Sequence, residues 1–328
     1  MTGLVIKSTG SWYEVLGEDQ KKYQCRTRGK LRLEGIKETN PIAVGDRVIF
    51  MQELANLPAL PAYRPGRSTT SGDGAGRQGI GSIEEILPRE NQILRQSVKK
   101  TGHSQVLAAN VDQVLLIATL KQPRTSLGFI DRFLVSAESF RIPQALLFNK
   151  SDLLSSEELI ELEALKILYH TIGVHTWSGS ALHDDSSVLS KVLQNKVTLI
   201  AGHSGVGKST LLNRISPEIN QTTSGISSFS EKGTHTTTFA EMFQLDSKTF
   251  VIDTPGIKEW GLVDMNPQEI SDYFPEMREL RLNCKFGARC IHINEPKCSV
   301  LEAVNAGTIS THRYKSYVSM VLGEDNRK

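Results

Sequence analysis

The segment Gly202-His203-Ser204-Gly205-Val206-Gly207-Lys208-Ser209 decides how the rest of this chain is interpreted. It has the pattern G-x-x-x-x-G-K-S of a phosphate-binding P-loop. An apolar run (197–201) precedes it and a helical pattern (208–215) follows it, which is the strand–loop–helix context that the motif requires. The alternative is a glycine-rich turn that binds nothing, but such a turn does not account for this context.

A nucleotide site assigns particular roles to these side chains. We expect Lys208 to neutralise β- and γ-phosphate oxygens and Ser209 to ligate Mg²⁺. Because phosphoryl transfer depends on charge stabilisation, Lys208 is also a predicted catalytic residue. The predicted phosphate-binding residues are Gly202, His203, Ser204, Gly205, Val206, Gly207, Lys208, Ser209 and Thr210.

The choice of base is indicated by Asn149-Lys150-Ser151-Asp152, an N-K-x-D pattern at the carboxyl end of an apolar, strand-like run. The Asp152 carboxylate can accept hydrogen bonds from the ring N–H and the exocyclic amine of guanine. Adenine lacks this pair of donors, and an unpaired carboxylate would be costly. The pattern alone is short and also fits a solvated loop. Beside a P-loop it favours guanine, and we expect Asn149, Lys150, Ser151 and Asp152 to bind GTP.

Two further segments are expected to respond to the γ-phosphate. Asp253-Thr254-Pro255-Gly256 follows an apolar strand, so Asp253 can hold the Mg²⁺ shell and the Gly256 N–H can contact the γ-phosphate. Residues 232–238 (KGTHTTT) lie between this segment and the P-loop, and a hydroxyl assigned to Thr237 would complete the Mg²⁺ shell. An exposed, threonine-rich loop is the alternative for 232–238.

The attacking water needs a residue that orients it. A Ras-like glutamine would follow Gly256, but Ile257 stands there, and an apolar side chain cannot orient water. We therefore predict slow intrinsic turnover and choose His235 as the catalytic substitute. The alternative for His235 is a packing role or a contact with RNA.

The order of the motifs is unusual, because N-K-x-D precedes the P-loop by about fifty residues. In an ordinary Ras-like GTPase the P-loop comes first and N-K-x-D comes late. The spatial arrangement can survive this change, since the chain ends of a compact domain often lie close together. We predict a circularly permuted α/β P-loop GTPase domain over residues 97–264.

Three cysteines and a histidine lie within fifteen residues near the C-terminus. They are Cys284, Cys290, His292 and Cys298. This set is typical of a tetrahedral Zn²⁺ site, and with no ligand position left for water the zinc is expected to be structural. No secretory signal is visible, so disulfides are not expected, and a reduced, metal-free cluster is the alternative. The cluster, together with helical patterns over 267–280 and 300–320, predicts a mostly helical zinc-binding domain over residues 265–328.

The sequence pattern over residues 1–96 predicts a small β domain. Five strand-like runs lie near 4–6, 12–15, 23–26, 47–50 and 82–87. About five short strands between turn signals suggest an OB-type barrel. Residues 58–81 have almost no apolar content and are expected to form a disordered insertion, whereas Cys25 is expected to pack inside.

A basic stretch in this region indicates RNA binding. The predicted RNA-binding residues are Lys21, Lys22, Arg26, Arg28, Lys30 and Arg32. Trp12 and Tyr23 would supply aromatic surface nearby, and basic side chains beside aromatic ones suit the phosphates and bases of a nucleic acid. A solvated, charged barrel face is the alternative, and charge alone does not decide between them.

Composition limits the remaining possibilities. The formal net charge is only +2, so any affinity for nucleic acid must come from local patches. No apolar run approaches the length that spans a membrane, and no transit segment is visible. We expect a cytoplasmic protein that acts as a monomer.

These features together resemble the ribosome small-subunit-dependent GTPase A family (RsgA, also called YjeQ) nearly end to end. Similar stretches are 25–32, 44–48, 87–89, 110–113, 149–152, 204–209, 235–238 and the cluster ending in Glu295-Pro296-Lys297-Cys298. The resemblance implies binding to the small (30S) ribosomal subunit and its rRNA late in maturation. It also implies that the subunit stimulates hydrolysis of GTP to GDP and that release follows.

Three departures from the family pattern stand out. Thr234 replaces the usual arginine before His-Thr-Thr-Thr, so one cationic contact is absent. Five residues (285–289) separate the first two cysteines where four are usual, so a one-residue bulge would be needed to deliver Cys284. The long loop near Gly72 resembles an insertion.

Two other functions remain open at this point. One is a nucleotide-gated RNA-binding module whose hydrolysis is incidental. The other is a permuted GTPase that serves another RNA or a membrane, although no amphipathic or lipidation signal favours a membrane.

Overall fold

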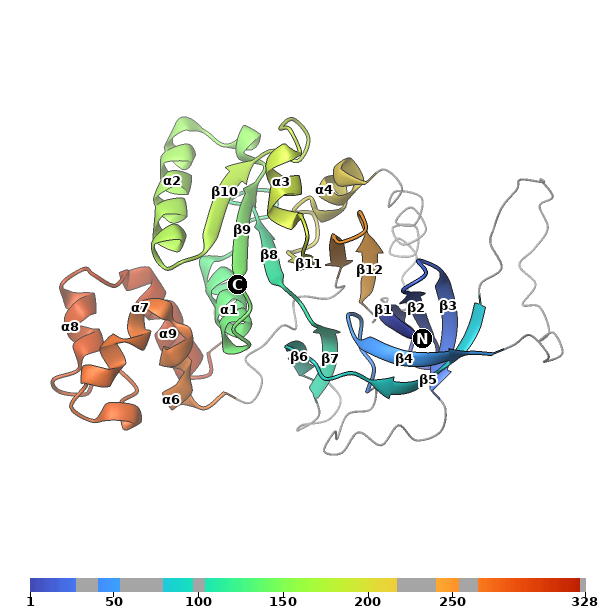
Figure 1. The fold of residues 1–328 in the computed structure, drawn as a ribbon. Helices are drawn as coiled ribbons and strands as arrows, with labels where there is room; N and C mark the ends of the chain where they lie inside the picture. The colour runs from blue at the N-terminus through green and yellow to red at the C-terminus, as the bar shows by residue number, and fades with distance from the viewer. Residues whose placement is uncertain (28–40, 54–78, 97–103, 217–239, 254–264, 325–328) are drawn as a thin grey trace.

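The computed structural model of the chain describes residues 1–27, 41–53, 79–96, 104–216, 240–253 and 265–324. Figure 1 shows an N-terminal β-barrel, a central sheet flanked by helices and a group of short C-terminal helices, with the sheet between the other two parts. The predicted order of a barrel, an α/β domain and a mostly helical region is confirmed. The boundaries at 96/97 and 264/265 stay predictions.

The barrel is closed by five strands of the described chain. They are β1 (Thr2–Ser8), β2 (Tyr13–Gly17), β3 (Lys22–Thr27), β4 (Arg47–Gln52) and β5 (Gly79–Ile86). The strand order is β1-β2-β3-β5-β4, and a pairing between β1 and β4 closes the ring. The β3–β5 pair is parallel and the others are antiparallel. The expected OB-type barrel is confirmed.

Strand alternation decides which side chains of β3 face inward. Tyr23 and Cys25 are 4% and 0% exposed and share a core with Phe50 and Ile83. The packing role predicted for Cys25 is confirmed. The prediction that Tyr23 supplies aromatic surface was wrong, because its ring packs 5.0 Å from the ring of Phe50 and its hydroxyl donates to Asp19.

The central sheet has the order β10-β9-β8-β11-β13-β12. Its strands are β8 (Gln113–Ala118), β9 (Gln144–Asn149), β10 (His175–Gly179), β11 (Val197–Ala201), β12 (Glu241–Gln244) and β13 (Phe250–Asp253). All neighbours are parallel except β12 and β13. Strand β8, which precedes the P-loop in the chain, thus pairs directly with β11, which leads into it. This is the arrangement that a permuted order requires.

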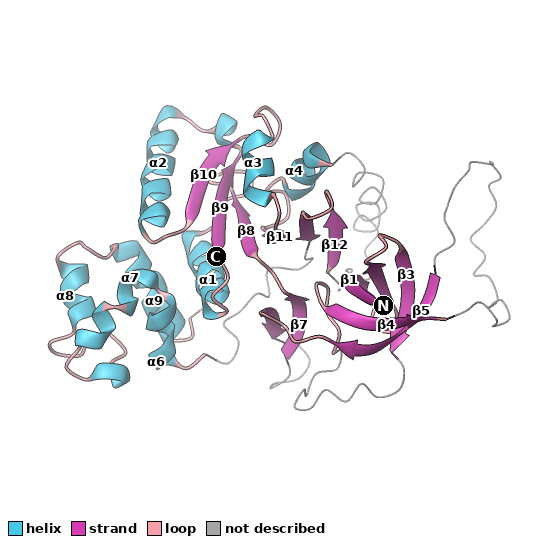
Figure 2. Cartoon of the chain, viewed as in Figure 1, coloured by secondary structure: helices cyan, strands magenta, loops and turns pink. Residues whose placement is uncertain are grey.

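Two pairs of helices cover the two faces of this sheet (Figure 2). One face packs against α1 (Leu127–Ser139) and α2 (Ser156–Thr171), and the other against α3 (Ser187–Leu193) and α4 (Lys208–Ile215). The helical pattern predicted over 208–215 coincides with α4. Ser155 caps α2 in a capping box.

Two connections attach the barrel to the central sheet. A hairpin of β6 (Gln92–Gln96) and β7 (Ser104–Ala109) leads from the barrel into β8. Barrel strand β1 also pairs with β12 at Lys7 and Glu241, whose side chains form an ion pair at 2.8 Å. The barrel and the central sheet therefore share one continuous strand order.

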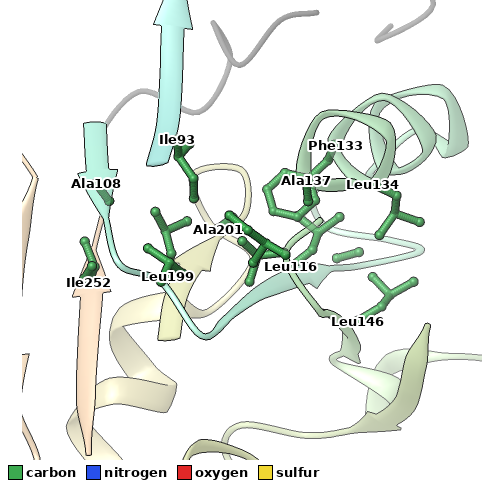
Figure 3. Close-up of a cluster of buried hydrophobic side chains, with 14 of the residues drawn as sticks. Ile93, Ala108, Leu116, Phe133, Leu134, Ala137, Leu146, Leu199, Ala201 and Ile252 are labelled. Atoms are coloured by element: carbon green, nitrogen blue, oxygen red, sulfur yellow. The ribbon is translucent and has the colours of Figure 1, made fainter. Parts of the chain in front are cut away.

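β8 is buried on both of its faces, which explains its uninterrupted apolar sequence. Leu116 packs in a core with Phe133 of α1, whereas Leu115 packs toward Leu212 of α4 on the opposite face. Figure 3 shows the first of these cores, which also receives Ile93 from β6. Alternate residues of one strand thus fix both helical layers, and with them the edge where the nucleotide motifs lie.

The C-terminal region consists of short helices. They are α6 (Pro267–Ile270), η3 (Ser271–Tyr273), α7 (Pro275–Arg278), η4 (Leu280–Asn283), η5 (Gly287–Arg289), α8 (Ser299–Asn305) and α9 (Thr311–Val321). The patterns over 267–280 and 300–320 are helical but interrupted. Pro275 places Phe274 in an extended conformation at the first break, and Gly307, with φ +75°, marks the second.

A buried ionic network joins α9 to α1. Asp131, 0% exposed, accepts hydrogen bonds from Arg313 Nη1 at 2.7 Å and from the Tyr169 hydroxyl at 3.0 Å. Arg313 also donates to Glu276 of α7 at 2.8 Å. Burial alone would raise the pKa of Asp131, but the charge of Arg313 and a hydrogen bond from His312 outweigh it and hold that pKa below its usual value. The C-terminal helices are therefore held on α1 by ionised groups.

Candidate functional site

The P-loop connects the end of β11 to the first residue of α4. Gly205 and Gly207 have φ values of +82° and +100°, in the left-handed region that favours glycine. The Lys208 side chain folds back over the loop, and its ammonium donates to the carbonyl oxygens of Gly202 and His203, the latter at 3.0 Å. A phosphate in this loop would therefore find a cation already beside it.

Asn149 joins the N-K-x-D segment to the P-loop. It is the last residue of β9 and is 3% exposed. Its Nδ2 donates to the Val206 carbonyl at 2.7 Å, and its Oδ1 accepts from the Ala181 N–H at 2.8 Å. A Cβ added to Gly207 would lie 2.4 Å from Asn149 Nδ2, so the contact also requires glycine at position 207. Two motifs that are far apart in the sequence are thus connected by direct hydrogen bonds.

A cavity of about 480 Å³ lies beside this connection, within the usual size range of small-molecule sites. It is lined by Asn149, Lys150, Asp152, Leu153, Ser180, Ala181, Leu182, Ser204, Gly205, Gly207, Lys208, Ser209 and Thr210. Nine of these residues belong to the predicted GTP-binding set. The other predicted members of the described chain, Ser151, Gly202, His203 and Val206, lie outside this lining.

The base-recognition segment offers its polar groups to the same cavity. Lys150 has φ +64°, and its Nζ donates to the Gln122 carbonyl at 2.5 Å. The next residues form η1 (Ser151–Leu153), which brings Asp152 to the cavity wall. The Asp152 side chain is 28% exposed, and the Nε2 of His183 lies 3.8 Å from its Oδ2. Asp152 and Lys208 therefore present an acceptor and a cation to one shared space.

The loop after β10 contributes residues that the sequence did not single out. Ser180, Ala181 and Leu182 line the cavity. Residues 177–179, just before this loop, lie in β10 and border a smaller neighbouring space of about 80 Å³. The loop residues are ordinary in type, so the available signal was their position one to three residues beyond a strand of the parallel sheet.

Asp253 ends β13, the strand next to β11. Burial lowers the pKa of Lys208, and the charge of Asp253 acts in the opposite direction. The carboxylate therefore acts on the P-loop lysine, and its strand is the neighbour of β11, which leads into the P-loop. His235, Thr237 and Gly256, for which roles at the γ-phosphate were predicted, lie outside the described residues.

Three of the residues predicted to bind RNA are described, and all three are exposed. The Arg26 guanidinium lies 3.7 Å from the centroid of the Trp12 ring. Lys21 and Lys22 each lie within 3.5 Å of a carboxylate, which reduces their net contribution to a positive surface. Arg28, Lys30 and Arg32 lie outside the described residues.

The predicted zinc ligands converge in the C-terminal region. The ligand atoms of Cys284, Cys290, His292 and Cys298 all lie within 4.8 Å of one another. The Cys298 sulfur is 3.7 Å from that of Cys284, 3.8 Å from that of Cys290 and 3.3 Å from His292 Nδ1. A tetrahedral ion with Zn–S bonds of about 2.3 Å separates its sulfurs by about 3.8 Å. The four groups therefore fit a tetrahedral metal.

The longer spacer does not displace Cys284, which is 6% exposed within the cluster. Residues 285–289 turn through η5, and Gly287 adopts φ +52°. The loop that carries His292 is held from α9, where the Tyr314 hydroxyl donates to the His292 carbonyl at 2.8 Å. Burial raises the pKa of the Cys290 thiol to about 12 and lowers the pKa of His292. A bound cation would offset the burial of thiolates here.

A P-loop and an N-K-x-D segment on one parallel sheet, in reversed chain order, define a circularly permuted GTPase. Family models agree: the RsgA GTPase model matches residues 86–263, and the RsgA N-terminal domain model matches residues 2–57. The chain belongs to the RsgA GTPase family, a family of GTP hydrolases.

Individual relatives extend over the whole chain. The Small ribosomal subunit biogenesis GTPase RsgA of Christiangramia forsetii is 46% identical, covering 99% of this chain and 97% of that relative. A protein of the same name from Cytophaga hutchinsonii is 44% identical, with full coverage of both. Among solved structures, YjeQ from Thermotoga maritima superposes with a TM-score of 0.72 at 32% identity, covering 100% of this chain and 99% of that one. YloQ, a circularly permuted GTPase, gives 0.70 at 30% identity, covering 100% and 96%. Within the described ranges, no helix is both long and apolar enough to cross a membrane.

Proposed function

We propose that this chain hydrolyses GTP to GDP in the late maturation of the small ribosomal subunit, and that the subunit stimulates its turnover. The observation that carries the proposal is the pair of hydrogen bonds by which Asn149 ties a guanine-type motif to the P-loop around one cavity. Relatives that cover the full chain are named small ribosomal subunit biogenesis GTPases, which supports the choice of partner.

The chemistry follows from the residues at the cavity. Lys208 neutralises charge on the β- and γ-phosphates, and the N–H groups at the start of α4 hold phosphate oxygens. Ser209 and Asp253 would hold Mg²⁺, with Thr237 completing the set in the triphosphate state. The ion supplies further neutralisation of the phosphate oxygens. Asp152 reads the guanine edge from the other segment of the site.

Slow intrinsic turnover suits a switch. Ile257 cannot orient water, so the chain hydrolyses GTP slowly until another molecule completes the site. His235 is the proposed residue that orients the attacking water once the small ribosomal subunit is bound. The chain then returns to the GDP state, in which it leaves the subunit.

The two accessory parts have supporting roles. We propose that the C-terminal metal is Zn²⁺, bound by Cys284, Cys290, His292 and Cys298, and that it is structural, since the four side chains fill a tetrahedral shell.

The barrel would contact rRNA through Arg26 stacked on Trp12, together with Lys21 and Lys22 and the basic residues Arg28, Lys30 and Arg32. The domains are taken as 1–96, 97–264 and 265–328, in a monomer that acts in the cytoplasm, where its subunit partner matures.

The decisive experiment compares GTP turnover by the full chain with and without purified small ribosomal subunits. The Lys208→Ala variant serves as the catalytic control, and purified large subunits serve as the specificity control. We expect slow turnover alone, several-fold stimulation by small subunits, none by large subunits and none in the variant. Turnover that small subunits leave unchanged would contradict the proposal.

The same preparation separates the alternative function. A nucleotide-gated RNA-binding module would bind subunits without being stimulated by them. Co-sedimentation with GDP, GTP and a non-hydrolysable GTP analogue therefore accompanies the turnover assay. The proposed switch requires tighter binding in the triphosphate state than with GDP.

A further inference from the structure

The loop between β10 and α3, residues 180–186, is tied at three points. Its Ala181 N–H donates to Asn149, as described above. The Ser180 N–H donates to Asp184 Oδ2 at 2.7 Å, which closes the loop on itself. The Ala181 carbonyl accepts from Arg214 Nη1 at 2.9 Å. Both polar groups of the Ala181 backbone are thus engaged, one by the N-K-x-D segment and one by a helix.

Arg214 occupies a particular position on that helix. It lies in the last turn of α4, the helix that begins at Lys208 of the P-loop. Six residues of α-helix span about 9 Å along the axis. One rigid element therefore holds the phosphate-binding lysine at its start and the cavity-lining loop at its end. Helix geometry therefore fixes the distance between the backbone of Lys208 and the backbone of Arg214.

The local sequence is adapted to this arrangement. A Cβ on Gly179 would lie 2.5 Å from Asp184 Oδ2, so glycine at the end of β10 leaves room for the carboxylate that closes the loop. Asp184 and Arg214 border the small space of about 80 Å³ that adjoins the larger cavity at Asn149, Ser180 and Ala181. Neither residue lines the 480 Å³ cavity, so neither is placed to touch a nucleotide there.

We propose that Arg214 is a positioning residue for the nucleotide base, with Asp184 as its partner within the loop. The Arg214 hydrogen bond fixes the position of the 180–182 backbone relative to the P-loop. That position determines how well the base fits the cavity, although Arg214 does not contact the base itself. The inference rests on the proposed GTP site and adds a determinant of affinity that no nucleotide-binding motif of this chain contains. Loss of the Arg214 hydrogen bond should weaken GTP binding by about two- to tenfold, the range of one protein hydrogen bond.

The test uses the full chain and two ligands that share phosphates but differ in having a base. GTP and inorganic tripolyphosphate are titrated by calorimetry into the native protein, Arg214→Met and Arg214→Lys. Methionine keeps the apolar stem and removes the donor, whereas lysine can still donate to the Ala181 carbonyl. Lys166→Met is the matched control, because it removes a cation of α2 whose ion pair, among the described residues, is with Glu163 at 2.8 Å. Thermal melts of each variant accompany the titrations.

We expect Arg214→Met to lose GTP affinity and keep tripolyphosphate affinity, Arg214→Lys to recover most of the loss, and Lys166→Met to match the native protein. In turnover assays the loss should fall on KM, with kcat nearly unchanged. Asp184→Ala should repeat the pattern, and Asp184→Asn, which can still accept from the Ser180 N–H, should not. Equal loss for both ligands, or none for GTP, would overturn the inference.

The native titrations keep this result separate from the proposed function. A native protein that binds ATP as tightly as GTP contradicts the guanine site itself. A native protein that prefers GTP, together with an Arg214→Met variant of unchanged affinity, contradicts only the role of Arg214.

Discussion

The side-chain amide of Asn149 donates to the backbone carbonyl of Val206 over 2.7 Å, so the base-recognition segment and the phosphate-binding loop are in direct contact. The permuted chain reaches Asn149 first and Val206 later, yet the two lie on neighbouring parts of one sheet edge. This contact is what makes a single nucleotide site out of two separate motifs.

Replacing Asn149 with alanine should therefore affect both halves of the site. The Val206 carbonyl and the Ala181 N–H would each lose a buried partner, at about 1–3 kcal/mol apiece. We expect GTP affinity to fall at least about tenfold. Fluorescent-nucleotide titration measures this, with Asn305→Ala, at an exposed position at the end of α8, as the control. Native-like affinity in the Asn149 variant would show that the contact is dispensable.

Asp152→Asn should change base preference more than it changes folding. The carboxylate accepts from guanine donors, whereas an asparagine amide can donate to the extra carbonyl of xanthine. We expect GTP affinity to fall by at least about a hundredfold, as for a site that loses paired hydrogen bonds, and xanthosine triphosphate affinity to rise. Competition titrations with GTP, ATP and xanthosine triphosphate measure the change. A variant that still prefers GTP would contradict the assignment of Asp152.

His235→Ala should separate binding from stimulated hydrolysis. A residue that only orients water contributes to the transition state, so GTP affinity should stay within about twofold while subunit-stimulated turnover falls by about 10²-fold or more. Single-turnover assays with saturating small subunits measure the rate. If stimulation persists unchanged, His235 has another role.

Removal of the proposed zinc should unfold the C-terminal helices locally. Their core contains the three cysteines themselves, so without a cation the buried ligands lose the group that organises them. We expect Cys298→Ser to contain less than one equivalent of zinc by mass spectrometry and to melt at lower temperature. Cys25→Ala changes a cysteine in the barrel core and should keep full metal content. A metal-free native protein would contradict the zinc assignment.

Arg313→Met should destabilise the junction between α9 and α1. The substitution leaves the Asp131 carboxylate buried without its principal cation, and breaking such a pair costs about 3–5 kcal/mol. Because the folded pKa of Asp131 lies below its unfolded value, the stabilisation is present at neutral pH and is lost only as the pH falls through the folded pKa. Denaturant melts at pH 7 measure the loss. Arg47→Met, which breaks an exposed pair with Glu90, should cost less than about 1 kcal/mol.

Local patterns predicted the parts of this molecule in which function depends on backbone conformation. The P-loop requires glycines at positive φ, and α4 begins where the motif places it. The capping box at Ser155 and the strand alternation of the barrel are equally local. Such features can be predicted because neighbouring residues determine them.

Other features depend on contacts that no local pattern contains. Asp131 and Arg313 lie 182 residues apart, and their pairing follows only from the packing of α9 on α1. The 180–182 loop acts through its backbone, so its residue types carry little information. The inward position of Tyr23 follows from strand alternation. Tyr23 lies two residues before Cys25, so both side chains point to the same buried face of β3.

The single pairing of β1 with β12 has a consequence for the integrity of the molecule. The edge strand of a sheet has unpaired backbone N–H and C=O groups, which can pair with strands of other molecules. Here the barrel covers part of the β12 edge, where Lys7 pairs with Glu241. We expect a chain that lacks residues 1–96 to expose this edge of β12 fully and to self-associate more readily, even where the nucleotide-binding fold is intact.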